Sequence, residues 1–138
     1  MSRTQRPTGI IRTLPWYSDR HRAVDGKDFD TKKRKAFDRM MHRFKLMEKS
    51  DSTSIIVSLA QRPIQEVLHC YIIIGNVVRV RATISRFIPG EEQATVKCWD
   101  GSERYSKWWV ELTAPVSWPP EEIRRRGFQG FRYTTDLW

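Results

Sequence analysis

Hydrophobic residues recur with a helical period in one stretch near the start of the chain. They stand at i, i+3, i+4, i+7 and i+10, on one face of an α-helix, and are Phe37, Met40, Met41, Phe44 and Met47. Asp30 or Thr31 can cap the start of this helix. We therefore predict an amphipathic helix that packs through its Phe and Met side chains and carries basic residues on its other face.

From residue 54 the hydrophobic pattern changes to that of β-strands. Segments rich in β-branched and aromatic residues cover 54–61, 66–74, 77–87, 94–99 and 106–113. Gly75 and Asn76 separate the second segment from the third, which predicts a hairpin that pairs Ile74 with Val77. In that register, strict alternation places the side chains of Arg79 and Arg81 on the same face of the sheet.

The two ends of the chain carry different patterns. Residues 1–27 mix Arg, Thr, Pro, Ser and Gly with neither period, so we expect a flexible basic arm. Near the other end, Pro119 and Pro120 precede two glutamates, then Arg124–Arg126 and Gly127, an order that suits the dipole of a short helix. The last eleven residues carry four aromatic side chains and are expected to pack on the body or on another subunit.

Together these elements predict an α+β fold. An N-terminal amphipathic basic helix packs on a mainly antiparallel sheet of about five strands, and a short C-terminal helix follows. The length of 138 residues and a hydrophobic content of 39% suit one modest core. We therefore expect an arm at residues 1–27 and a single domain at 28–138.

The net charge is concentrated in one part of the chain, and this concentration indicates a class of binding partner. The formal charge is +9, and residues 1–49 hold fourteen Lys and Arg against six Asp and Glu. An excess of this kind favours a polyanion, either nucleic acid or an anionic membrane surface. The run Lys32–Lys35 lies near the predicted helix start, where positive charge opposes the helix dipole, so helix stability does not explain it.

We accordingly expect a non-enzymatic nucleic-acid-binding protein that recognises RNA or DNA by charge and shape. No helix-turn-helix, zinc-finger, RNP or KH signature is present to read a base sequence. The candidate phosphate-binding residues are Arg20, Arg22, Lys32, Lys33, Arg34, Lys35, Arg39, His42, Arg43, Lys49, Arg79 and Arg81. Trp99 and Trp109 alternate with lysines on predicted strands and are candidate base-stacking residues, or else packing residues beneath the helix.

Catalytic chemistry is not expected. The chain contains no GxSxG, Walker, GxGxxG or HExxH motif. His69 and Cys70 are neighbours on a predicted strand and point to opposite faces, which argues against a shared metal site. Cys70 and Cys98 are expected to be reduced thiols. We therefore predict no enzyme activity, no cofactor, no metal and no small-molecule substrate.

Other interpretations of the same charge stay open. The Lys32–Lys35 run with Arg20 and Arg22 resembles a bipartite nuclear import signal, which would suit a protein of the nucleus and cytoplasm. The run is also compatible with a solvated helix start. Further alternatives are a matrix-like peripheral membrane protein that binds anionic lipid, and a protein-interaction adaptor. In being small, basic and rich in tryptophan on its predicted sheet, the chain resembles viral accessory or structural proteins, a resemblance that no motif carries. A homo-oligomer is also expected.

The longest apolar stretch does not suit a membrane span. It covers residues 67–78 and is interrupted by His69, Gly75 and Asn76. A helix that crosses a bilayer needs about 20 apolar residues. We therefore expect an intracellular protein without a transmembrane segment.

Overall fold

The computed structural model describes most of the chain. It covers residues 6–14, 26–50, 52–93, 95–97 and 103–138, and for residues 26–36 and 97 it describes the backbone alone.

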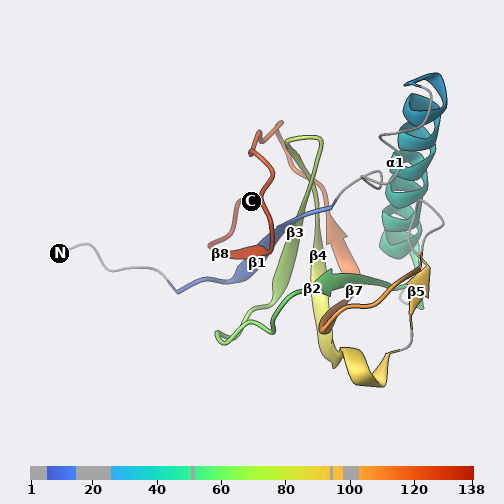
Figure 1. Cartoon of the computed structure of the whole chain (residues 1–138). Helices are drawn as coiled ribbons and strands as arrows, with labels where there is room; N and C mark the ends of the chain where they lie inside the picture. The colour runs from blue at the N-terminus through green and yellow to red at the C-terminus, as the bar shows by residue number, and fades with distance from the viewer. Residues whose placement is uncertain (1–5, 15–25, 51, 94, 98–102) are drawn as a thin grey trace.

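The fold is a curled six-stranded sheet with one long helix against one of its faces (Figure 1). The strand order is β2-β7-β4-β3-β1-β8. These strands are β1 (Gly9–Thr13), β2 (Ile55–Leu59), β3 (His69–Ile74), β4 (Val77–Pro89), β7 (Trp108–Ser117) and β8 (Phe131–Thr134). The helix is α1 (Gly26–Lys49). All pairings in the sheet are antiparallel except that of β1 with β3.

Two short strands lie outside this sheet. They are β5 (Val96–Lys97) and β6 (Glu103–Arg104), which pair with each other, and the 3-10 helix η2 (Gly90–Glu92) precedes them. The predicted five-strand sheet is therefore wrong in composition. The segment at 94–99 contributes only β5, and β2 pairs with β7 instead of its sequence neighbour β3.

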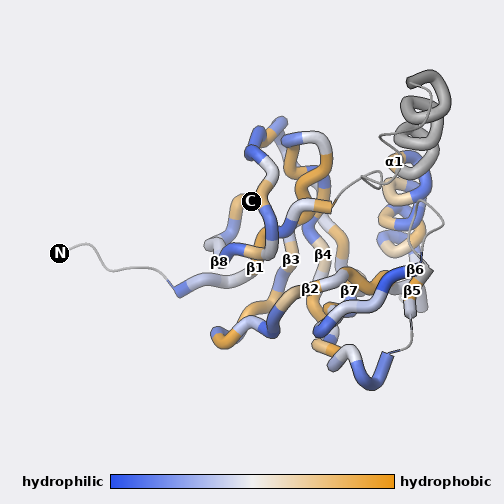
Figure 2. Tube along the Cα trace, viewed as in Figure 1, coloured by the Kyte–Doolittle hydropathy of each residue, from blue (hydrophilic) through white to orange (hydrophobic). Residues whose placement is uncertain are grey.

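The sheet is buried on both faces. On one face, Met40, Phe44 and Met47 of α1 pack with no exposed surface against residues of the inner strands. On the other face, Ile123, Phe128, Leu137 and Trp138 of the C-terminal segment cover a second cluster, which is Ile11, Tyr71, Ile73 and Val78. Figure 2 shows the hydrophobic residues running along the strands between these two layers. Two-sided burial explains why the strands are rich in continuous apolar runs.

Strand β1 lies in the segment that we expected to be a flexible arm. It is an inner strand, parallel to β3 and antiparallel to β8. Ile10 belongs to the α1-side core and Ile11 to the opposite one. A strand buried on both faces shows no alternation of apolar and polar residues, so the period-2 test could not detect these five residues.

The β3–β4 hairpin confirms the predicted turn. Gly75 and Asn76 have φ of 63° and 61°, the left-handed pair that a two-residue hairpin turn requires. Ile74 pairs with Val77 as predicted. A register shift between Ile72 and Ile73 then inserts an extra residue on β4.

This bulge corrects the prediction that Arg79 and Arg81 share a face. The Arg79 guanidinium lies 5.2 Å from the centre of the Phe37 ring on α1. The Arg81 guanidinium instead donates to the main-chain oxygen of Trp138, 2.7 Å away, in the C-terminal segment. The two arginines therefore lie on opposite sides of the sheet.

The predicted C-terminal helix is absent, and residues 123–125 instead run extended beside the start of β4. Arg124 forms a β-bridge with Val77, and the Val78 N–H donates to the Ile123 carbonyl at 2.8 Å. The helix predicted between Pro120 and Gly127 would have about two turns, too few to be stable alone. The extended conformation instead brings Ile123 into the second core cluster and supplies main-chain hydrogen bonds to the hairpin.

Arg12 connects the two edges of the curled sheet. Its Nε donates to the main-chain carbonyl of Ser58 at 2.5 Å, and a terminal nitrogen donates to the Ser58 hydroxyl at 2.9 Å. The other terminal nitrogen donates to the carbonyls of Thr13 and Gly130 at 3.2 and 3.4 Å. Ser58 belongs to edge strand β2 and Gly130 directly precedes edge strand β8. The Arg12 side chain therefore links edge strand β2 to the start of edge strand β8, across the open side of the curled sheet.

Candidate polyanion-binding surfaces

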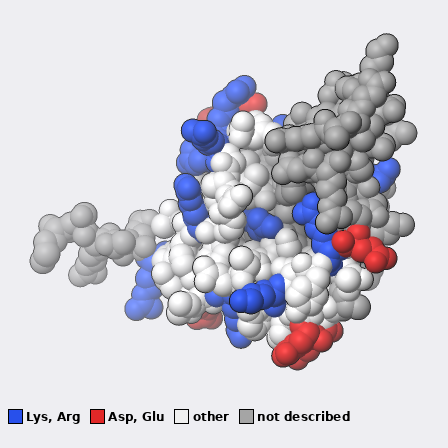
Figure 3. All heavy atoms as spheres, in the orientation of Figure 1, with Lys and Arg blue, Asp and Glu red and all other residues white. Residues whose placement is uncertain are grey.

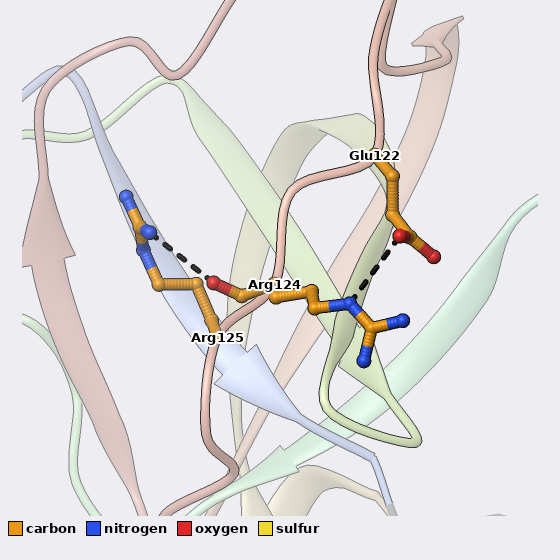
Figure 4. Close-up of polar contacts among 3 residues, drawn as sticks. All are labelled: Glu122, Arg124 and Arg125. Atoms are coloured by element: carbon orange, nitrogen blue, oxygen red, sulfur yellow. Dashed lines mark hydrogen bonds and ion pairs between the residues drawn. The ribbon is translucent and has the colours of Figure 1, made fainter.

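The clearest group of exposed cations in the described chain is Arg124, Arg125 and Arg126, here called the arginine segment. All three residues are exposed. Arg124 Nε contacts a Glu122 carboxylate oxygen at 3.3 Å, and Arg125 donates to the Arg124 carbonyl at 3.3 Å (Figure 4). The Arg124 side chain is 79% exposed, so this ion pair is screened by water and leaves most of the charge available.

Main-chain contacts hold the arginine segment in place from both sides. The Arg125 N–H donates to the Asn76 carbonyl at 3.1 Å, and the Gly127 N–H donates to the Asn76 side chain at 3.0 Å. The Phe128 N–H donates to the Thr13 hydroxyl at 3.0 Å. The three guanidinium groups are thus presented from a backbone that is already ordered, next to the tip of the β3–β4 hairpin.

The extended conformation changes the interpretation of these arginines. In a short helix, their place in the last turn would serve helix stability. Without that helix the stability argument no longer applies. Figure 3 shows basic side chains gathered over the C-terminal segment at the upper left of the view, with acidic groups beside them. The three consecutive arginines are plain in the sequence, but the helix that explained them there is absent from the fold.

The second basic surface is the solvent-facing side of α1. Arg39, His42 and Lys49 are exposed on it, and Arg43 is exposed while donating to the Ser54 carbonyl at 3.2 Å. Their exposed placement matches the predicted amphipathic pattern.

The basic run at 32–35 belongs to the same helix. Lys32, Lys33, Arg34 and Lys35 lie within α1, and their side chains are outside the described part. Arg20 and Arg22 fall outside the described residues altogether.

Arg79 and Arg81 make structural contacts and are half-buried. Arg79 Nε donates to the Ile74 carbonyl at 3.0 Å in addition to its contact with Phe37. Arg81 lies against the Trp138 ring, 5.9 Å from its centre. Both guanidinium groups therefore already have partners inside the protein.

Of the two candidate stacking residues, the structure describes Trp109, which is not available to stack on a base. Trp109 is only 3% exposed, so its ring cannot accept a base in this conformation. Its indole N–H has no hydrogen-bond partner among the described residues. Trp99 lies outside the described residues. The alternative that tryptophan serves packing therefore holds for Trp109.

Comparison with known proteins gives no relative from which to transfer a function. No family model, curated protein or solved structure matches the chain. The candidate surfaces therefore depend on geometry and charge alone.

His69 and Cys70 lie within the described residues, whereas Cys98 lies outside them. Within the described part of the chain, no three His, Cys, Asp or Glu side chains come together as metal ligands. Cys70 is fully buried, and this burial raises the pKa of its thiol to about 12, which keeps it protonated. Burial and the nearby charge of Arg81 lower the pKa of His69 below its ordinary value.

The helical content of the described residues does not include a membrane span. None of these helices has both the length and the apolar composition to cross a bilayer.

Exposed charges of both signs lie near each end of β4. Val77, at the start of this strand, is bridged to Arg124, and Glu121 and Glu122 are exposed in the same segment. Beyond the other end of the strand, Glu91 and Glu92 are exposed on η2, and the carbonyl of the exposed Lys107 accepts a hydrogen bond from Gly90. The arginine segment is distinguished by three consecutive cations and not by an absence of acidic neighbours.

Proposed function

We propose that this protein is a non-enzymatic nucleic-acid-binding protein whose arginine segment contacts the phosphate backbone. The observation that carries this proposal is the exposure of three consecutive arginines on an ordered extended segment. Within the described part of the chain, Glu122 is the one carboxylate paired with them. Guanidinium groups bind phosphate oxygens with two parallel hydrogen bonds, which makes arginine well suited to this contact.

The hairpin next to the arginine segment connects it to the second basic surface. Val77 bridges to Arg124 on one side, and Arg79, two residues later, contacts Phe37 of α1 on the other. The basic run of α1 lies in the turns directly before Phe37. A phosphate backbone that crosses this end of the molecule passes the arginine segment and the helix whose sequence carries the basic run.

Recognition by this surface is driven by charge. The cations that are exposed supply phosphate contacts, whereas the buried Trp109 supplies no stacking surface for a base. We therefore expect affinity to depend strongly on salt and weakly on base sequence.

The test compares two triple variants that remove the same amount of charge. The first is Arg124→Gln, Arg125→Gln and Arg126→Gln; the matched control is Arg86→Gln, Arg104→Gln and Lys107→Gln, three exposed cations elsewhere. Binding of labelled duplex and single-stranded DNA and RNA is measured by fluorescence anisotropy across a salt series. If all three arginines contact phosphates of a duplex, the negative slope of log affinity against log salt becomes shallower by about 2.7 in the first variant. The control keeps a slope near that of the wild type.

Two results would overturn the proposal. One is an equal loss of affinity in both triple variants, which would show that only the overall charge matters. The other is arginine-dependent binding to anionic phospholipid vesicles with no binding to any nucleic acid. That result would show that the arginine segment binds membranes instead.

A further inference from the structure

The loop between β2 and β3 presents a large apolar side chain to solvent. Ile64 in this loop is 97% exposed. Its N–H and that of Gln65 both donate to the Tyr133 hydroxyl, at 2.8 and 3.1 Å. Pro63 and Val67 on either side are buried. Single exposed apolar residues are common on surfaces, but this one projects from a loop that the fold holds in a fixed conformation.

A depression lies next to this projecting residue. Its volume is about 550 Å³, and it is lined by Arg6, Pro7, Thr8, Gln65, Glu66 and Leu68. Leu68 is itself 58% exposed, so the lining offers apolar surface. Arg6 and Glu66 are exposed and have opposite charges. The same patch thus contains an apolar projection, a depression of mixed polar and apolar lining, a cation and an anion.

We propose that this patch is the contact between two copies of the chain, related by a two-fold axis. In such a contact each patch meets an identical one, so a surface must be complementary to itself. Ile64 of one copy fills the depression of the other, and Arg6 of one copy lies against Glu66 of the other. Both contacts occur twice. The charges of the lining cancel, which makes a polyanion or an anionic membrane a poor occupant.

The position of the patch keeps the arginine segment free. Leu68 directly precedes the first residue of β3, and the hairpin that holds the arginine segment follows its last residue. A strand of six residues spans about 20 Å, so the two sites lie at opposite ends of β3. A dimer through the Ile64 patch therefore carries its two arginine segments at its far ends.

The first test measures the mass of the full chain in solution by sedimentation equilibrium. We expect a reversible dimer over protein concentrations of about 1 to 100 µM. Ile64→Asp removes an apolar contact twice per dimer and should raise the dissociation constant by about a hundredfold or more. Leu46→Asp is the matched control, since Leu46 is a 39% exposed apolar residue on α1, and it should leave the dissociation constant unchanged. Circular dichroism verifies that both variants are folded.

A charge exchange tests the two-fold geometry itself. Arg6→Glu and Glu66→Arg each place like charges in contact, so each variant alone should be monomeric. Mixed together, they restore both opposite-charge contacts, and a heterodimer should form. A monomeric wild type at about 100 µM, or an Ile64→Asp variant that associates like the wild type, would overturn the proposal. So would a monomer whose Ile64 drives binding to lipid vesicles. No nucleic acid is present, so failure here leaves the proposed function unaffected.

Discussion

Arginine residues have sharply different environments in this molecule, and the net charge alone does not distinguish them. Arg12 donates to three carbonyls and a hydroxyl, none of which is a carboxylate. Arg62 lies over the rings of Phe87 and Trp108, at 5.6 and 5.8 Å from their centres. The side chains of the arginine segment are exposed to solvent. Of these three, the arginine segment is the one presented for a charged partner, whereas Arg12 stabilises the fold.

Replacement of Arg12 by methionine should destabilise the protein. The change keeps much of the side-chain volume but leaves the acceptors on Ser58 and Gly130 without their donor. We expect the free energy of unfolding to fall by about 2–4 kcal/mol, since hydrogen bonds from charged donors are involved and buried acceptors lose their partners. Urea denaturation measures this loss.

The control for Arg12 is Arg86→Met. Arg86 forms a surface ion pair with Glu111 at 3.3 Å, and its side chain is 65% exposed. Removal of such a pair should cost less than about 1 kcal/mol. Equal losses in the two variants would refute a structural role for Arg12 in joining the sheet edges. Burial lowers the pKa of Arg12, but the group stays protonated across the ordinary pH range, so the loss should not depend on pH.

Single residues were predictable from the sequence only where the local period was regular. The exposed positions Arg39, His42 and Lys49 follow from the helical pattern of α1. The faces of Arg79 and Arg81 did not follow, because one inserted residue reverses the alternation and no sequence signal marks that bulge. The role of Arg12 depends on Ser58, 46 residues away in the chain, and long-range contacts of this kind leave no local pattern.

At the scale of elements, the C-terminal segment covers one face of the sheet without forming the predicted short helix. Its last residues make several contacts with the strands. Trp138 meets the Tyr71 ring edge-on at 5.0 Å, and its indole N–H donates to the Ser117 hydroxyl at 2.7 Å. The Leu137 N–H donates to the Tyr71 hydroxyl at 3.0 Å. The segment is therefore a structural layer, comparable to α1 on the other face.

Replacement of Trp138 by alanine should loosen this layer. The change removes the ring contact with Tyr71, the bond to Ser117 and the surface on which Arg81 lies. We expect the free energy of unfolding to fall by about 2–4 kcal/mol, near the lower end for large aromatic residues because Trp138 is only partly buried. Thermal and urea denaturation measure the effect. Tyr105→Ala is the control, since Tyr105 is 66% exposed, and a comparable loss there would contradict the assignment.

Elements marked by a regular helical period or by a turn signal were predictable, whereas β1 and the C-terminal segment were not. The spacing of Met40, Phe44 and Met47 predicted α1, and the Gly75-Asn76 turn predicted the β3–β4 hairpin. Strand β1 shows no period because both of its faces are covered. The prediction of a C-terminal helix failed for another reason. Its charge order suits a helix, yet pairing with the hairpin and burial of Ile123 outweigh that local preference.

For the whole molecule, the sequence indicated a basic protein but not where its charge would be presented. Most of the excess lies in residues 1–49, and we assigned the phosphate contacts mainly to that part. The fold brings the hairpin, the middle of α1 and the arginine segment to one end of the sheet, whereas Glu91 and Glu92 follow the other end of β4. Such convergence depends on topology, which the strand pattern did not reveal.

The two proposals together predict that binding depends on the length of the nucleic acid. Two copies joined at the Ile64 patch with their β3 strands in line would hold their arginine segments about 40 Å apart, twice the length of β3. That distance corresponds to about 12 base pairs at 3.4 Å per pair.

A duplex of about 40 base pairs can therefore reach both arginine segments of one dimer, whereas a duplex of about 10 base pairs reaches only one. The second contact on the longer duplex is intramolecular, so the wild type should bind it at least about tenfold more tightly than Ile64→Asp does. On the short duplex the two proteins should bind alike, which controls for any direct effect of the substitution on the phosphate-binding surface. Anisotropy titrations at one fixed salt concentration measure all four affinities.

An equal loss on both duplexes would place Ile64 in the nucleic-acid contact itself. Equal affinities of the two proteins on both duplexes would show that dimerisation does not contribute to binding. A dimer that contacts one long duplex through both arginine segments must bind it more tightly than a monomer does.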